Sequence, residues 1–121
     1  MEFEELVRKI NKHVEELDYF SARKYIEQNI DDLQQNKHLL NSNAREILMF
    51  LVDQINSGHA AMTRQELSAI NAINEYSYKF DLRGIKMLLK NRAALFMRED
   101  IDGYLNKDAK EILTGMGAIK K

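Results

Sequence analysis

The feature that most constrains the fold is the spacing of the apolar residues, which follows the period of an α-helix. Phe3, Val7, Ile10, Val14 and Leu17 are separated by alternate steps of four and three residues, which places them on one stripe of a helix. The chain also lacks proline, although average usage of about 5% would give about six. Proline interrupts helices, so both observations predict a mainly α-helical fold with about six helices.

Capping signals mark where these helices begin and end. Asp18 is the expected N-cap of the second helix, and Gly58 is expected to end an apolar third helix over 44–57. Thr63-Arg64-Gln65-Glu66 is a capping box that opens a fourth helix to about residue 74. A fifth helix is expected from residue 78 or 81 to 91, and Asn106 is expected to cap a last helix that ends at Gly115.

The segment between the last two helices is ambiguous because its apolar run is short. Residues 94–98 and 104–106 form a small β-hairpin in one interpretation, and Asp100-Ile101-Asp102-Gly103 supplies the turn. In the alternative, the chain is an all-α helical bundle and residues 93–98 continue a helix. In either case we expect a single domain over 1–121, with an N-terminal helical hairpin (1–40) packed on a helical core (41–121) and no internal repeat.

Composition excludes several functional classes. The chain has no cysteine, which rules out disulfides, thiolate zinc sites and a cysteine nucleophile. No apolar run reaches the roughly 18 residues that a membrane span needs, so we expect a cytoplasmic protein that makes no membrane contact. His13, His38 and His59 lie too far apart for a local metal motif. No nucleophile elbow or phosphate-binding glycine loop is present, so the sequence predicts no enzyme, no cofactor and no metal site.

Residues 98–109 resemble the calcium-binding loop of an EF-hand at four internal positions. Asp100, Asp102, Gly103 and Leu105 match the third, fifth, sixth and eighth positions of that loop. The first position is occupied by Arg98 and the twelfth by Ala109, where calcium needs carboxylate ligands. We therefore expect that the loop does not bind calcium.

Positive charge is concentrated in one segment of a chain whose net charge is only −1. Residues 79–98 contain one acid, Asp81, and six bases, which are Lys79, Arg83, Lys86, Lys90, Arg92 and Arg98. The first four are spaced by four, three and four residues, so on one helix they form a narrow exposed stripe. Such a stripe suits a phosphate backbone or an acidic protein surface, although a merely solvated face has the same pattern.

The order of elements over residues 44–114 resembles the winged helix-turn-helix superfamily. An apolar helix, a glycine turn and two further helices are followed by a strand–turn–strand candidate and a last helix. The stretch Leu105-Asn106-Lys107-Asp108-Ala109-Lys110-Glu111-Ile112-Leu113 is similar to the one with which the family often closes its wing, with Asn for threonine and Ala for glycine. The connection before the fifth helix is longer than usual in the family, and the wing has few arginines. The resemblance implies that helix 78–91 is a DNA recognition helix.

Two functions follow as hypotheses. The first is a small non-enzymatic regulator that binds DNA through the basic residues of 79–98, with Arg92 and Arg98 supporting from the wing. The second is a helical protein–protein interaction module that uses the same basic stripe for an acidic partner, or the Phe3–Leu17 stripe for a partner helix. The Phe3–Leu17 stripe either packs within the chain or forms the interface of a homodimer.

Overall fold

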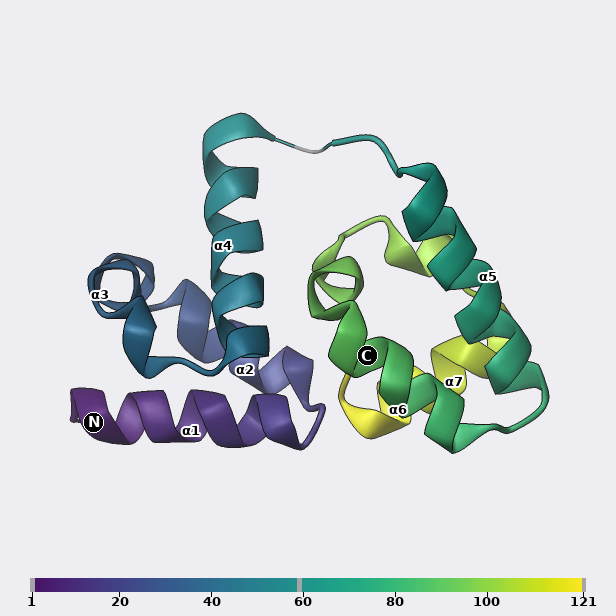
Figure 1. Ribbon diagram of the computed structural model, residues 1–121, viewed down its shortest axis with the longest axis horizontal. Helices are drawn as coiled ribbons and strands as arrows, with labels where there is room; N and C mark the ends of the chain where they lie inside the picture. The colour runs from purple at the N-terminus through teal and green to yellow at the C-terminus, as the bar shows by residue number, and fades with distance from the viewer. Residues whose placement is uncertain (1, 59, 121) are drawn as a thin grey trace.

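The computed structural model describes residues 2–58 and 60–120, and this part of the chain is helical almost throughout (Figure 1). The expected mainly α-helical class is therefore confirmed, and the described residues contain no strand, as in the all-α alternative. Within them no helix is long and apolar enough to cross a lipid bilayer. His59 lies outside the described residues. The α-helices are α1 (Phe3–Glu15), α2 (Tyr19–Glu27), α3 (Ile30–Gln35), α4 (Ser42–Ser57), α5 (Arg64–Tyr78), α6 (Leu82–Asn91) and α7 (Lys107–Met116), and the 3₁₀ turns are η1 (Lys37–Leu39), η2 (Ala93–Met97) and η3 (Ile101–Gly103).

The predicted caps at Asp18, at the Thr63–Glu66 capping box and at Asn106 are confirmed, and Asn41 and Asp81 cap α4 and α6 in the same way. The side chains of Asp18, Asn41, Asp81 and Asn106 each accept a hydrogen bond from a backbone N–H in the first turn of the following helix. The capping box at α5 is complete, with both reciprocal bonds present. These bonds satisfy N–H groups that have no partner inside the helix, which is why short polar residues define the helix starts.

Helix ends differ more from expectation. The apolar pattern of the second helix continues to Leu33, but the backbone breaks after Glu27 and resumes as α3. The last helix ends at Met116 and is closed by Gly117, which adopts a left-handed conformation with φ 82°, rather than by Gly115. Gly115 lies inside the helix, where a glycine is tolerated but not required.

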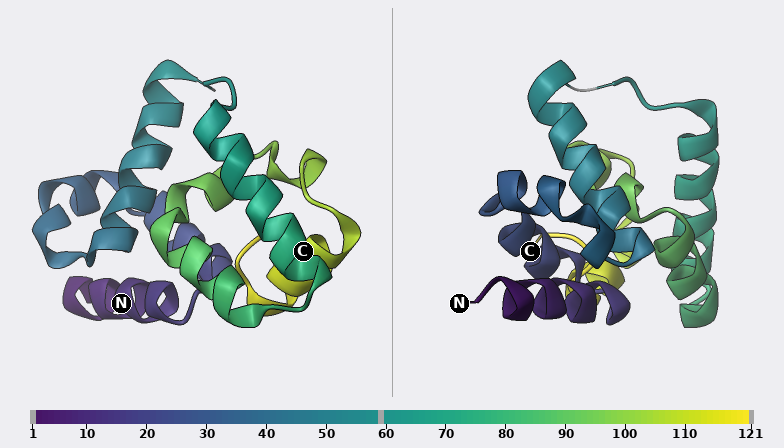
Figure 2. Two further views of the ribbon diagram at one scale, coloured as in Figure 1. Left: turned by 45° about the vertical axis from the view of Figure 1, so that its right-hand side comes forward. Right: turned by 60° about the vertical axis from the view of Figure 1, so that its left-hand side comes forward.

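Of the two interpretations of residues 93–106, the β-hairpin is wrong. Residues 93–97 form the 3₁₀ turn η2, which packs against α2 and α4 at the centre of the molecule (Figures 1 and 2). Leu95, Phe96 and Met97 are consecutive and all buried. Consecutive side chains of a strand point to opposite faces, so an edge hairpin would expose one of them. Burial of all three favours the tight helical turn.

Residues 104–106 pair with α5 instead of with 94–98. The Asn74 side-chain amide donates to the Tyr104 carbonyl at 3.0 Å, and its oxygen accepts from the backbone N–H of Asn106 at 2.9 Å. The Asn106 amide donates back to the Asn74 carbonyl at 3.1 Å. This exchange satisfies backbone groups that a strand partner would otherwise have satisfied.

The same arrangement occurs a second time in the chain. The Asn11 amide donates to the Leu39 carbonyl at 3.1 Å, and its oxygen accepts from the backbone N–H of Asn41 at 2.8 Å. The Asn41 amide donates to the Asn11 carbonyl at 3.3 Å. Asn11 on α1 therefore relates to the N-cap of α4 as Asn74 on α5 relates to the N-cap of α7.

The sequence around these two N-caps is also repeated. Residues 40–48 and 105–113 share the pattern Leu-Asn-x-x-Ala-x-Glu-Ile-Leu. Upstream, the Ile-Asn pair at 10–11 recurs at 73–74, and the turn Leu17-Asp18 corresponds to Phe80-Asp81. The chain is thus a diverged tandem repeat, although no internal repeat was expected. Matching residues are 63 positions apart in the first two helices of each half (α1–α2 and α5–α6) and 65 positions apart in the last helix of each half (α4 and α7).

The repeat divides the molecule between α4 and α5 rather than at residue 40. The first half (2–58) contains α1–α4, and the second half (64–120) contains α5–α7 with η2 and η3. Figure 1 shows the two halves side by side. Segment η2 of the second half packs against α4 of the first half, so one continuous hydrophobic core extends through both halves.

Candidate functional site

The second helix of the second half, α6, carries the exposed basic face that the sequence indicated. Asp81 caps α6 by accepting from the backbone N–H of Gly84 at 3.0 Å. Ile85 and Leu89 are buried on the inner side, which fixes the rotation of the helix. Gly84 lets the helix lie against α5, because a Cβ there would come within 2.9 Å of the Tyr76 ring.

Arg83, Lys86 and Lys90 lie together on the outer face of α6. They line a shallow depression with Met87, whose side chain is 57% exposed. No ion pair joins these three bases to any carboxylate of the described residues. We call these four residues the α6 face: a large apolar side chain among three cations. Each like-charged pair three or four residues apart costs about 0.2–0.5 kcal/mol, so the arrangement mildly destabilises the isolated helix.

Lys79 does not belong to this face. It is the C-cap of α5, before the turn, and its ammonium forms an ion pair with Glu75 at 3.0 Å. The expectation that it continues the stripe assumed one helix from 78 to 91. The turn at 79–81 separates Lys79 from the other cations, because the helix period does not continue across it.

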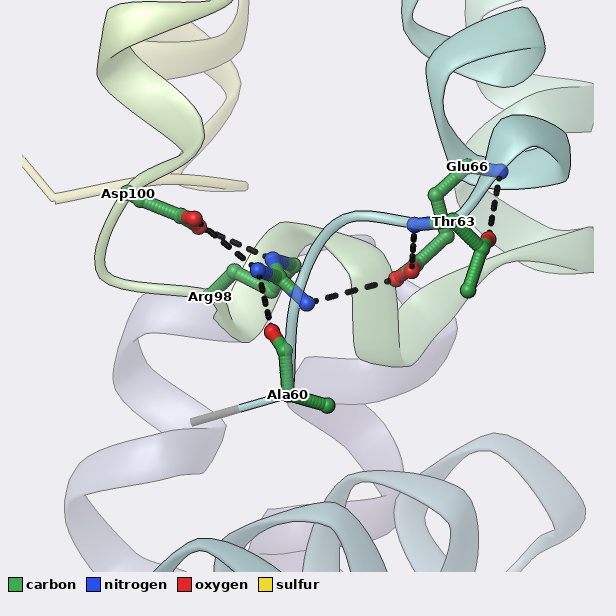
Figure 3. A network of polar contacts seen from close by, with 5 residues as sticks. All are labelled: Ala60, Thr63, Glu66, Arg98 and Asp100. Carbon is green, nitrogen blue, oxygen red and sulfur yellow. Dashed lines mark hydrogen bonds and ion pairs between the residues drawn. The ribbon is translucent and has the colours of Figure 1, made fainter. Parts of the chain in front are cut away.

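Arg98 is also excluded, because its side chain is buried inside the structure (Figure 3). Its guanidinium donates to both carboxylate oxygens of Asp100 at 2.8 and 2.9 Å and to the Ala60 carbonyl at 2.8 Å. Glu66, which caps its own helix at Thr63, lies 3.7 Å away. The hydrogen bond to Asp100 raises the pKa of Arg98. The assignment of Arg98 to a DNA-contacting wing is therefore wrong.

Arg98 ties the segment before α5 to the segment after η2. Figure 3 shows its guanidinium between the carboxylate of Asp100 on one side and that of Glu66 on the other. The loop that resembles an EF-hand is thus organised around a cation at its first position. Among the described residues no group of three potential ligands is positioned to hold a metal ion.

Arg92 lies at the C-cap of α6 and is half-buried. It lines a separate shallow depression with Glu46, Glu66 and Ala94, on the side of the molecule where η2 meets α4. Because the described residues form no β-hairpin, Arg92 does not lie on a wing, contrary to the expectation from the sequence.

The apolar stripe of the first helix is packed within the chain. Val7, Ile10, Val14 and Leu17 are buried in a single copy, with Ile10 fully inaccessible, and Phe3 is half-buried against the same core. The helix packs on α2 and α4. Of the two alternatives for this stripe, the structure places it against the chain's own helices, so these four side chains are not available to a second copy.

The repeat gives the α6 face a counterpart in the first half. The equivalent positions on α2 are Phe20, Arg23, Lys24 and Glu27, which line a groove. Its other side is formed by second-half residues, including Phe96, Met97 and Ile119. Arg23 bridges the two sides by donating to the Met97 carbonyl at 2.8 Å. The α2 face therefore borders a neighbouring unit, whereas the depression on the α6 face is lined by α6 alone.

Sequence reasoning found the three cations but missed Met87 and Phe80, the exposed residue immediately before Asp81. Both are apolar, and helical periodicity alone does not separate an exposed apolar residue from a core residue. Alignment of the two halves would have indicated Met87, because it pairs Met87 with the exposed Lys24, but it pairs Phe80 with buried Leu17 and so gives no signal for the exposure of Phe80.

Comparison of the chain with protein-family models, with curated proteins and with solved structures finds no match.

Proposed function

We propose that this protein is a non-enzymatic cytoplasmic interaction module that binds an acidic protein segment on the α6 face. The observation that carries the proposal is the repeat. The α2 face borders second-half residues across a groove, whereas the depression on the α6 face is lined by α6 alone, and only Lys90 at its edge also borders first-half residues, including Val14 and Asn41. A partner bound on the α6 face would occupy the position next to α6 that second-half residues occupy next to α2.

The charges of the α6 face determine which partner fits. The three bases Arg83, Lys86 and Lys90 stand where the α2 face has Phe20, Arg23 and Glu27, so these three positions of the α6 face gain two positive charges and lose a negative one. Carboxylates would relieve the repulsion between these cations. Met87 among them offers an apolar contact, which matches interfaces that combine an apolar centre with a polar rim.

DNA is the second candidate, supported by the connection of α5 to α6. The two helices are joined by three residues, 79–81, as in a helix-turn-helix, and α6 is the helix that would enter the major groove. This fits the helical part of the resemblance to winged helix-turn-helix domains. Three cations provide few phosphate contacts, however, and the described residues form no wing.

Charge reversal distinguishes binding on the α6 face from nonspecific attraction. The variant Lys86→Glu/Lys90→Glu is compared with Lys107→Glu/Lys110→Glu, which changes net charge equally on exposed positions of α7. Two acidic probes are titrated at about 50 mM salt, where charge contacts are strong. They are poly-glutamate and a synthetic peptide rich in glutamate and leucine. We expect tighter binding of the leucine-containing peptide, lost in the α6 variant and retained in the α7 variant.

A mixed-sequence DNA duplex is titrated in parallel. Binding to the duplex that exceeds peptide binding, with a log–log salt slope of about −0.9 per phosphate contact, would assign the face to DNA. Equal loss of peptide binding in both charge-reversal variants would contradict a localised site.

A further inference from the structure

Three helices of this chain end in the same backbone motif. After α1, α5 and α7, one residue adopts a left-handed conformation: Leu17 (φ 64°), Phe80 (φ 57°) and Gly117 (φ 82°). In each case its N–H donates to the carbonyl three residues earlier, and the next N–H donates to the carbonyl five residues earlier. This pair of bonds defines a Schellman cap, in which glycine is the usual residue.

Two of the three residues are explained by the fold. Gly117 is a glycine, and a Cβ at this position would lie 2.6 Å from an oxygen of Asp18. Leu17 is 4% exposed, so burial of its side chain compensates for an unfavourable backbone conformation.

Phe80 has neither explanation. Its ring is 68% exposed, and its backbone conformation is one that a bulky L-residue seldom adopts. The position therefore combines backbone strain with an aromatic ring in water. Because no intramolecular burial of the side chain offsets this backbone strain, a contact with another molecule is a reason to retain the residue.

The first half shows what covers an equivalent turn. The backbone N–H of Phe20, at the start of α2, donates to the Gly117 carbonyl at 2.9 Å. Gly117 also lies against Asp18, the N-cap of α2. The segment that follows α7 therefore lies on the α1–α2 turn, and Ala118 and Ile119 are buried there. No segment of the described residues makes the corresponding bond to Arg83, which is equivalent to Phe20.

We propose that Phe80 is the apolar anchor by which an acidic protein partner docks on the α5–α6 turn and the α6 face. This rests on the proposed function and extends it to the turn. The partner's acidic side chains would lie over Arg83, Lys86 and Lys90, and an apolar residue of the same segment would cover the Phe80 ring. Charge complementarity selects an acidic protein segment, because Arg83, Lys86 and Lys90 present three cations around the exposed Met87.

The chain contains no tryptophan, so Phe80→Trp provides a single fluorescent reporter at the anchor. The probe is the synthetic peptide rich in glutamate and leucine. We expect the reporter to emit as a solvent-exposed indole in the free protein and to shift to shorter wavelength when the peptide binds. Phe80→Asn, which suits the left-handed backbone, is expected to weaken peptide binding by about tenfold or more.

Tyr78→Ala is the matched control, because Tyr78 is a similarly exposed aromatic residue two positions earlier in an ordinary helical conformation. We expect it to change affinity by less than about twofold, the effect typical of peripheral contacts. Circular dichroism and the midpoint of urea unfolding check that both variants are folded.

The outcomes separate this inference from the proposed function. If Lys86→Glu/Lys90→Glu abolishes peptide binding but Phe80→Asn leaves it unchanged, the anchor is wrong while the proposed function stands. If neither variant affects binding, both fail. A blue shift with anionic phospholipid vesicles but not with the peptide would overturn the protein partner in favour of a lipid surface. Self-association of the wild type that Phe80→Asn disperses would overturn it in favour of a second copy.

Discussion

The hydroxyl of Tyr19 on α2 donates a hydrogen bond to the carbonyl of Leu89 on α6 at 2.7 Å, and this bond joins the two halves of the repeat. Both partners are fully buried. The Leu89 carbonyl lies in the last turn of its helix, where carbonyls lack helical partners. The Tyr19 hydroxyl supplies that partner and helps to fix α6 against the first half, which leaves the α6 face outward.

Alkaline pH is expected to weaken the fold through Tyr19. Burial, and secondarily the charge of Glu46, raises the pKa of Tyr19 well above its ordinary value of about 10. Above that pH the unfolded chain loses this proton while the folded chain retains it, so the free energy of unfolding falls as pH rises. The stabilisation that the protonated Tyr19 hydroxyl contributes is fully present below pH about 10. Above that pH, it decreases by up to about 1.4 kcal/mol per pH unit.

Urea unfolding of the wild type, Tyr19→Phe and Tyr78→Phe between about pH 8 and 11 measures this effect. Tyr19→Phe should be less stable at neutral pH, by about 1–3 kcal/mol for the orphaned carbonyl, and should lose less stability on going to alkaline pH. Tyr78→Phe, at an exposed position, should follow the wild type. An identical pH dependence of all three proteins would show that Tyr19 does not carry the effect.

Removal of either repeated asparagine is expected to destabilise the protein similarly. Asn74→Ala and Asn11→Ala each remove two side-chain hydrogen bonds to the segment that precedes a final helix. We expect a loss of about 1–3 kcal/mol for each, measured by urea unfolding. Asn71→Ala, on an exposed position of α5, is the control and should change stability by less than about 0.5 kcal/mol.

The two glycines near the end of α7 are expected to respond oppositely to alanine. Gly115 lies within the helix with nothing within 4 Å of a Cβ, so Gly115→Ala should stabilise the protein by about 0.5–1 kcal/mol. Gly117→Ala should destabilise it by more than about 1 kcal/mol, because of its positive φ and the crowding by Asp18. Thermal unfolding of the two variants tests the difference in sign.

Glycine is expected to distinguish the two bulky left-handed residues. Leu17→Gly relieves strain but removes a buried side chain, so we expect a net loss of about 1–4 kcal/mol. Phe80→Gly relieves the same strain and removes an exposed ring, so stability should stay equal or rise by about 1 kcal/mol. A large loss for Phe80→Gly would mean that the ring supports the fold, which would weaken the case for an external contact.

The stripe of α1 is expected to behave as core. Ile10 is fully inaccessible, so Ile10→Ala should lower the free energy of unfolding by about 2–5 kcal/mol. The loss should be independent of protein concentration, and sedimentation of wild type and variant should give the same molecular mass. A midpoint that rises with protein concentration would instead indicate that the stripe is shared between copies.

The sequence alone determined the helical class, most of the helix starts and the inward faces of α1, α2 and α6. Each of these depends on local chemistry. The side chain of Asp81 reaches a backbone N–H three residues away, and Ile85 and Leu89 lie one helical turn apart. The cations of α6 were identified for the same reason, because their spacing along one helix fixes their common face.

Tertiary structure decided the rest. Arg98 and Lys90 look alike in sequence, yet Arg98 is buried because Asp100, Ala60 and Glu66 converge on it from segments up to 38 residues away. The turn at 93–97 became helical because α2 and α4 bury its three consecutive apolar side chains. Periodicity along the chain contains no information about such distant neighbours. For the same reason only the folded chain shows that one half of the repeat borders the other, while the equivalent face of α6 remains open.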